Sequence, residues 1–275
     1  MKRNWEINIK DPIKGRKDKP RTSGLTMVLD KGKGINGLKD LLEVSGSYID
    51  FIKFSFGTSF VYSQKLVKQK LDLIKKENIE VYPGGTLFEV AVAQNQINEY
   101  LFRAKQLGFT AIEISNGTIS YGENFRSEMI NKANALGFKV LTEVGKKDKQ
   151  YSLSLKEMVK QIEKDISNGA SQVIIEARES GKDISIYKKD GSVDLKMFKG
   201  ITNSLTEYGN KLIWEAPLKK QQIFLINKLG PNVNLGNIKS EEVIALECLR
   251  RGLRGDTFKN TLNDQEYNQK SSSII

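Results

Sequence analysis

The chain has 275 residues, of which 39% are hydrophobic and 28% are charged, a composition typical of a soluble globular protein with a buried core. The single cysteine, Cys248, excludes an internal disulfide, and together with the absence of histidine it argues against a zinc site. The formal net charge of +11 is spread along the chain without a nucleic-acid-binding motif, so we expect small anionic substrates and no nucleic acid partner.

From the sequence we expect no export signal and no membrane-spanning segment. The N-terminal sequence MKRNWEINIKDPIKGRKDKPR is polar throughout and lacks the apolar centre of a signal peptide. No window approaches the roughly 20 apolar residues that are needed to cross a bilayer. We therefore expect a cytoplasmic protein with no membrane contact.

Eight short apolar segments are predicted to be β-strands. They are rich in β-branched residues and are apolar at both odd and even positions, as expected for strands that are covered on both faces. In chain order they span residues 25–29, 48–54, 80–82, 111–114, 139–143, 172–176, 212–215 and 232–235.

Amphipathic segments between the strands are predicted to be helices. They span residues 63–78, 97–108, 125–137, 154–169, 195–209 and 241–253, and Ser154 is placed to cap the fourth of them. Alternating strands and helices form parallel sheets, and eight such units favour closure into a barrel, a fold that typically takes about 250 residues. The sequence therefore predicts a single-domain (β/α)8 TIM barrel over residues 23–257, with an N-terminal arm (1–22) and a polar, flexible tail (258–275).

Carboxylates recur where the predicted strands end, which is the edge that carries the active site in (β/α)8 barrels. The acids at the ends of the first, fourth, fifth, sixth and seventh strands are Asp30, Glu113, Glu143, Glu176 and Glu215. Strand ends often meet solvent, so a solvated set of acids is the simple alternative. If the acids are buried together they repel one another, and a hard divalent cation, with Mg²⁺ as the default, resolves that repulsion.

Glycine-rich turns and cations on the same edge indicate a site for a small anion. Backbone amides at such turns can bind phosphate, although most glycine-rich loops bind nothing. The residues that we expect to bind substrate are Lys146, Arg178, Gly84, Gly85, Ser115, Asn234 and Gly236.

Several motifs resemble those of the phosphosulfolactate synthase family. They occur in the family's order from about residue 25 to residue 257 and read LTMVLDKG, VYPGGTLFE, EISNG, LTEVGKKD, VIIEARESG, WEAPLKKQQ, NVNLGNI and LECLRRGLRGDT. One departure is Ser55-Phe56, which precedes GTS where the family often has Gly-Trp. The change keeps an aromatic side chain but could alter the fit of the substrate.

The resemblance implies a (β/α)8 barrel and a Mg²⁺-dependent enzyme of the carbon–sulfur lyase class. Family members add sulfite to phosphoenolpyruvate and form (2R)-phospho-3-sulfolactate, which begins one route to coenzyme M. Such barrels commonly associate, so a homo-oligomer is expected. Two alternatives stay open: a non-catalytic, stress-related relative like those of plants, and a lyase that combines phosphoenolpyruvate with a different nucleophile.

This reaction needs a divalent cation near the substrate carboxylate and one proton donor. The predicted Mg²⁺ ligands are Glu113, Glu143 and Glu176, with Asp30 and Glu215 as further candidates. Lysine acts as acid or base beside Mg²⁺ in enolase-like sites, so the lack of histidine is no obstacle. Lys147 is our first candidate for the proton donor and Lys53 is the second.

Overall fold

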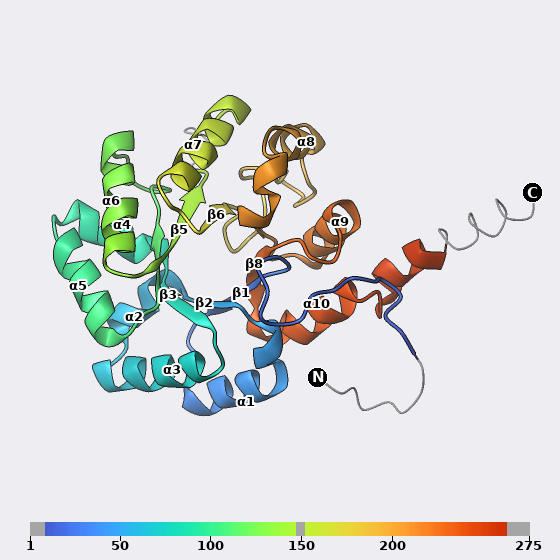
Figure 1. Cartoon of the computed structure of the whole chain (residues 1–275), viewed down its shortest axis with the longest axis horizontal. Coiled ribbons are helices and arrows are strands. Elements are labelled where there is room, and N and C mark those ends of the chain that lie inside the picture. The colour runs from blue at the N-terminus through green and yellow to red at the C-terminus, as the bar shows by residue number, and fades with distance from the viewer. Residues whose placement is uncertain (1–8, 147–151, 263–275) are drawn as a thin grey trace, which may run out of the picture.

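In the computed structural model, which describes residues 9–146 and 152–262, eight parallel strands surround a central axis (Figure 1). The strands are β1 (Thr26–Asp30), β2 (Phe51–Phe54), β3 (Glu80–Pro83), β4 (Ala111–Ile114), β5 (Lys139–Val144), β6 (Gln172–Ile175), β7 (Leu212–Glu215) and β8 (Leu235–Lys239). Hydrogen-bonded neighbours follow the order β3-β2-β1-β8-β7-β6-β5-β4. At the remaining seam, between β3 and β4, Thr110 N donates to Val81 O at 3.1 Å. The predicted (β/α)8 barrel is thus confirmed.

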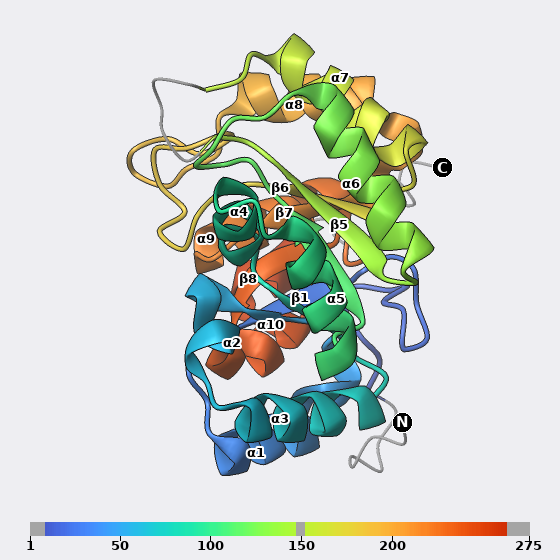
Figure 2. The ribbon, with the colours of Figure 1, turned by 90° about the vertical axis from the view of Figure 1, so that its left-hand side faces the viewer.

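Helices surround the sheet on its outer side, as the side view in Figure 2 shows. They are α1 (Ile35–Ser45), α2 (Thr58–Val61), α3 (Gln64–Lys76), α4 (Gly85–Ala93), α5 (Ile97–Leu107), α6 (Glu123–Ala135), α7 (Leu155–Ser167), α8 (Leu195–Ser204), α9 (Lys219–Leu229) and α10 (Val243–Arg250). Helix α7 begins with the predicted cap, since the Ser154 side chain accepts from Glu157 N and the Glu157 side chain accepts from Ser154 N. Among the described residues, no helix combines the length and the apolar character that a membrane crossing requires.

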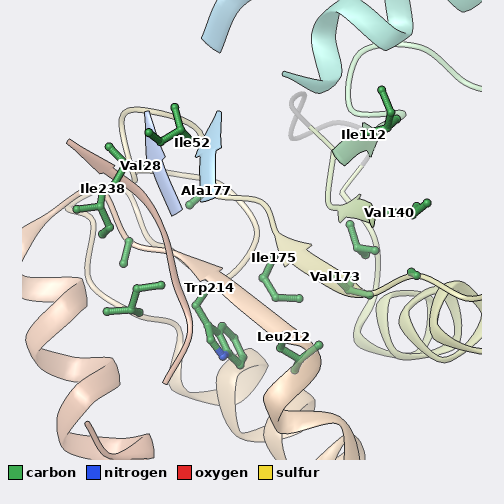
Figure 3. Close-up of a cluster of buried hydrophobic side chains, with 14 of the residues drawn as sticks. Val28, Ile52, Ile112, Val140, Val173, Ile175, Ala177, Leu212, Trp214 and Ile238 are labelled. Atoms are coloured by element: carbon green, nitrogen blue, oxygen red, sulfur yellow. The ribbon is translucent and has the colours of Figure 1, made fainter. Parts of the chain in front are cut away.

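Two hydrophobic layers stabilise the barrel. The outer layer lies between strands and helices and includes the side chains labelled in Figure 3, among them Ile112, Val173 and Trp214. The inner layer fills the barrel and consists of Leu25, Met27, Leu29, Phe51, Tyr82, Ala111, Leu141, Ile174 and Ile213. Successive residues of a strand point to opposite faces, which explains why these strands are apolar at both parities.

The predicted bounds of two strands were wrong. Residues 48–50 precede β2, because the 3₁₀ turn Gly46–Tyr48 reaches into the predicted segment. Strand β8 spans Leu235–Lys239 and not 232–235, so the predicted segment lies mostly before it. The true strand, LGNIK, contains Gly236 and Asn237, and both residue types are uncommon inside strands.

The described part of the N-terminal segment crosses the end of the barrel opposite to the strand C-termini. Arg16 pairs with Glu247 of α10 at 2.9 Å, and Arg21 pairs with Asp50, just before β2, at 2.7 Å. Ile13 N donates to Arg251 O at 3.2 Å. These contacts close the N-terminal end of the barrel, so the opposite end provides its mouth. The predicted tail lies outside the described residues from position 263 on.

Candidate active site

Strand alternation directs four carboxylates into the mouth of the barrel. The inner apolar layer contains Ala111, Leu141, Ile174 and Ile213. Two residues further along the same strands, on the same face, stand Glu113, Glu143, Glu176 and Glu215. Each of these four residues is at most 3% exposed. The acids therefore form a buried floor beneath the mouth and are not the solvated set of the simple alternative.

Lys53 stands among these acids. It occupies an inward position of β2, and its Nζ lies 2.9 Å from Glu113 Oε2, 3.6 Å from Glu143 Oε2 and 3.7 Å from Glu215 Oε1. Burial would lower the pKa of Lys53, but Glu113, Glu143 and Glu215 together raise it well above the ordinary value. Lys53 is thus a fixed cation at neutral pH.

Glu113 depends on a glycine that begins α4. Its Oε1 accepts from Gly85 N at 2.8 Å. A Cβ atom on Gly85 would lie 2.4 Å from that oxygen and 2.5 Å from Ser115 Cβ. Only glycine therefore lets the start of α4 approach the carboxylate so closely.

Glu143, Glu176 and Glu215 offer three carboxylate oxygens that lie within 4.8 Å of one another. Glu176 Oε2 is buried and accepts no hydrogen bond from the described residues. Glu215 Oε2 accepts from Ala177 N at 2.8 Å, while its Oε1 faces Lys53. The three residues are the described cluster that suits a hard metal ion with oxygen ligands.

Burial and mutual repulsion make these acids hard to ionise. The pKa of Glu176 is raised well above its ordinary value, first by burial and then by Glu143 and Glu215. Burial raises the pKa of Glu215 to about 8. Glu143 raises this pKa further, whereas Lys53 lowers it. Burial also raises the pKa of Glu113, and Lys53 partly offsets it. A cation that relieved this repulsion would bind where the acids are most crowded.

A cavity of about 860 Å³ opens above the carboxylate floor. The charge of its lining changes from negative at the base to positive at the rim. The four glutamates are buried at the base, whereas Arg178 and Lys182 are exposed and Lys239 is half-buried. Arg178 and Lys182 belong to the loop after β6, and Lys239 ends β8. The cavity thus combines an acidic base with a rim that carries three cations.

Glu143 is held from several sides. Ser115 Oγ lies 2.9 Å from Glu143 Oε1, and Arg126 of α6 donates to Glu143 O at 2.9 Å while it pairs with Asp165 of α7 at 2.6 Å. Gly145, with φ +136°, then turns the chain, and a Cβ there would lie 2.7 Å from Glu176 Cβ. These contacts fix the end of β5 next to the end of β6.

Sequence reasoning missed two residues that build the site. Glu89 is the single charged residue of α4, whose other residues are apolar or small apart from Thr86, and an isolated acid in such a helix was the available signal. It accepts from Ser115 Oγ at 2.6 Å and is 2% exposed. Asn237 lines the cavity and donates to Arg178 O at 3.3 Å, but it was hidden by the wrong bounds of β8.

Some of the site residues predicted from the sequence line the cavity, and others do not. Those that line the cavity are Lys53, Gly84, Gly85, Glu113, Glu143, Glu176 and Arg178. Ser115 lies beneath them, bonded to Glu143. Gly236 faces the inner layer, where an added Cβ would lie 2.7 Å from Met27 Cε. Lys147 lies outside the described residues.

Three predicted residues do not line the cavity and are bonded to other parts of the chain. Asn234 precedes β8, accepts from Leu25 N at 3.0 Å and donates to Leu212 O at 3.0 Å, so its predicted place at the mouth was wrong because the strand bounds were wrong. Lys146 Nζ donates to Asn116 O at 2.6 Å and Ile119 O at 3.1 Å. Asp30 pairs with Lys70 of α3 at 2.5 Å.

The chain is similar to known proteins over most of its length. Residues 14–256 match the model of a family described as (2R)-phospho-3-sulfolactate synthase (ComA). The phosphosulfolactate synthase of Methanothermobacter thermautotrophicus is 47% identical over 245 residues, which cover 88% of this chain and 94% of that protein. The phosphosulfolactate synthase of Methanocaldococcus jannaschii is 48% identical, over 86% of this chain and 94% of that protein.

Solved structures support the fold alone. The N-acetylneuraminate lyase of Mycoplasma synoviae superposes with a TM-score of 0.51 and 14% sequence identity, over 91% of this chain and 82% of that chain. Such low identity carries no information about the substrate.

Proposed function

The chain belongs to the (2R)-phospho-3-sulfolactate synthase family, and on that premise we propose that it adds sulfite to phosphoenolpyruvate in a Mg²⁺-dependent reaction. The product is (2R)-phospho-3-sulfolactate. The observation that supports this proposal most strongly is the buried acidic floor around Lys53 beneath a cationic rim, because the reaction joins two anions and needs cationic groups around them.

The residues present suit a Mg²⁺ ion at the base of the cavity. Glu143, Glu176 and Glu215 would hold it, since their oxygens lie within 4.8 Å of one another and Glu176 Oε2 accepts no hydrogen bond from the described residues. This set replaces Glu113 of the predicted ligands with Glu215, because the clustered oxygens belong to Glu143, Glu176 and Glu215, whereas Glu113 Oε2 lies 2.9 Å from Lys53 Nζ. When bound, Mg²⁺ would stabilise negative charge on the carboxylate of the substrate.

The remaining groups would orient the substrates and move the proton. A sulfur–carbon bond forms at the methylene carbon of phosphoenolpyruvate, the electron pair of the double bond moves towards the carboxylate, and the neighbouring carbon takes a proton. The chain has no histidine, so the proton donor that we propose is a lysine. We keep Lys147 as the first candidate for the donor and Lys53 as the second, and solvent then returns the proton to the lysine.

Lys53 has a second role that its surroundings favour more directly. A lysine that contacts Glu113, Glu143 and Glu215 within 3.7 Å is held charged and immobile. It would compensate part of the acidic floor and attract the substrate carboxylate. Arg178, Lys182 and Lys239 at the rim would take the phosphate and the incoming sulfite.

The test is an assay with purified protein, phosphoenolpyruvate, sulfite and Mg²⁺, in which mass spectrometry identifies the product. We expect phosphosulfolactate from the wild type, loss of turnover by more than about 100-fold in Glu143→Gln, and no product after chelation. Glu247→Gln, a buried acid at the opposite end of the barrel, serves as the control and should keep normal turnover.

Two outcomes would redirect the proposal. Consumption of phosphoenolpyruvate with another nucleophile but not with sulfite would establish the different lyase. No product with any nucleophile, over a range of pH and metals, would favour the non-catalytic relative. Comparing Lys147→Ala with Lys53→Ala decides the proton donor, since only the donor variant should keep substrate affinity while losing turnover.

A further inference from the structure

Glu89 organises the loop between β4 and α6 from behind the site. It lies on α4 and is 2% exposed. Its Oε1 accepts from Gly117 N at 3.0 Å, and its Oε2 accepts from Thr118 N at 2.8 Å and Ile119 N at 3.2 Å. By accepting from three backbone N–H groups, the Glu89 carboxylate fixes the loop that donates to it.

Ser115 connects this anchored carboxylate to Glu143. Its Oγ lies 2.6 Å from Glu89 Oε1 and 2.9 Å from Glu143 Oε1, and the residue has no exposed surface. A hydroxyl has one proton to donate and two lone pairs that accept. The Oγ atom therefore contacts both carboxyl groups while it donates its one proton to one of them, and this contact links the position of Glu143 Oε1 to the position of Glu89.

We propose that Glu89 and Ser115 are positioning residues that set the carboxylate of Glu143 for metal and substrate. This inference rests on the function proposed above. Neither residue lines the cavity described above, so they would reach the metal and the substrate through Glu143. Partners that orient a ligand carboxylate typically change metal affinity or activity 10- to 100-fold when removed. Ser115, predicted from the sequence to bind substrate, is thereby assigned a different task.

The test uses three matched variants of the full chain. Ser115→Ala removes the bridging hydroxyl, and Glu89→Gln removes the charge of the anchor but keeps one acceptor oxygen. Ser45→Ala is the control, because Ser45 is equally buried and its hydroxyl donates to Leu41 O within α1, away from the mouth. Calorimetric titration with Mn²⁺ gives the metal Kd, and urea unfolding gives the stability of each variant.

We expect Ser115→Ala and Glu89→Gln to raise the Kd for Mn²⁺ by about 10-fold or more and to lower kcat in parallel. Ser45→Ala should change stability by a similar amount and leave both quantities unchanged. The double variant Glu89→Gln/Ser115→Ala should be no worse than the more affected single variant, because both act through one contact. Multiplied single effects in the double variant would overturn the proposal.

Crystal structures give a readout that does not require activity. The Glu143 carboxylate should keep its place in Ser45→Ala and rotate or become disordered in Ser115→Ala. An unmoved Glu143 with an unchanged Mn²⁺ Kd would overturn the positioning role. A wild type that binds Mn²⁺ but forms no phosphosulfolactate would instead contradict the proposed reaction, and the Mn²⁺ affinities would still decide the role of Ser115. If the wild type binds no Mn²⁺, the crystal comparison decides alone.

Discussion

Glu215→Gln should stabilise the metal-free protein at alkaline pH, although it alters the candidate active site. Burial raises the pKa of Glu215 to about 8 in the folded protein, from an ordinary value of 4.5. The folded state therefore binds a proton more tightly than the unfolded state does. The stability associated with this group is fully present below pH 4.5 and is lost as the pH rises towards 8.

The size of the effect follows from the width of that window. One pKa unit corresponds to about 1.4 kcal/mol, so the ionised carboxylate costs the folded state up to about 5 kcal/mol at pH 8 and above. Glutamine removes this cost, and its carbonyl oxygen can still accept from Ala177 N, which now donates to Glu215 Oε2 at 2.8 Å. Neighbouring acids partly readjust their protonation, so we expect about 1–3 kcal/mol of stabilisation at pH 8 and almost none at pH 4.5.

The assay is urea unfolding of both proteins in the presence of a chelator, at pH 5, 6, 7 and 8. Glu247→Gln is the control, since burial opposes ionisation there but Arg16 and Arg251 lower the pKa of Glu247. Its stability is present above pH 4.5 and is lost on acidification, so Glu247→Gln should be destabilised at pH 8. If Glu215→Gln were as stable as the wild type or less stable at pH 8, the reasoning would be refuted, because ionisation of Glu215 would then not destabilise the folded state.

Three further changes test the site. Lys53→Met leaves buried carboxylates without their cation, so it should lower the unfolding free energy by about 3–5 kcal/mol at pH 7 and abolish activity. Urea denaturation at pH 7 and pH 5 should show that this decrease in unfolding free energy is smaller at pH 5. Gly85→Ala places a Cβ 2.4 Å from Glu113 Oε1 and should lower the unfolding free energy by about 1–3 kcal/mol. The control is Gly37→Ala, in an open position of α1, which should raise the unfolding free energy by about 0.5–1 kcal/mol. Thermal melts of both variants check these values. Mg²⁺ at 100 times its Kd should raise the unfolding free energy by about 2.7 kcal/mol, and a chelator should reverse this.

Strand parity explains how much of the site could be predicted from the sequence. A strand that is covered on both faces has no polar side, so hydrophobicity alone does not tell which residues point into the barrel. The charged residue at the end of the strand indicates this instead. Leu141 and Glu143 have the same parity, and the structure places Leu141 inside the barrel and Glu143 directly above it. The same step of two residues relates Ile213 to Glu215. The two-residue periodicity of the strands was therefore sufficient to predict that the acids lie together at the mouth of the barrel.

The unpredicted parts depend on contacts between segments that are distant in the sequence. Asn234 was placed at a strand end because the predicted strand spans residues 232–235, but its side chain bonds to the chain before β1 and to β7 at the opposite end of the barrel. Glu89 lies on a helix, and only the packing of α4 against β4 brings it to Ser115. Glu113 was predicted as a metal ligand ahead of Glu215, because nothing in the sequence says which acid Lys53 approaches at 2.9 Å.

The order of charges with depth restricts how a substrate can lie in the cavity. The base contains four buried acids and one described cation, Lys53, so it carries an excess of negative charge that a Mg²⁺ ion would reduce. The rim carries Arg178, Lys182 and Lys239, and Glu179 is the exposed acid among them. A ligand with a carboxylate at one end and a phosphate at the other would then lie with the carboxylate towards Lys53 and the metal and the phosphate towards the rim. In the proposed reaction, sulfite would then reach the methylene carbon from the cationic side, since the acidic base repels a second free anion.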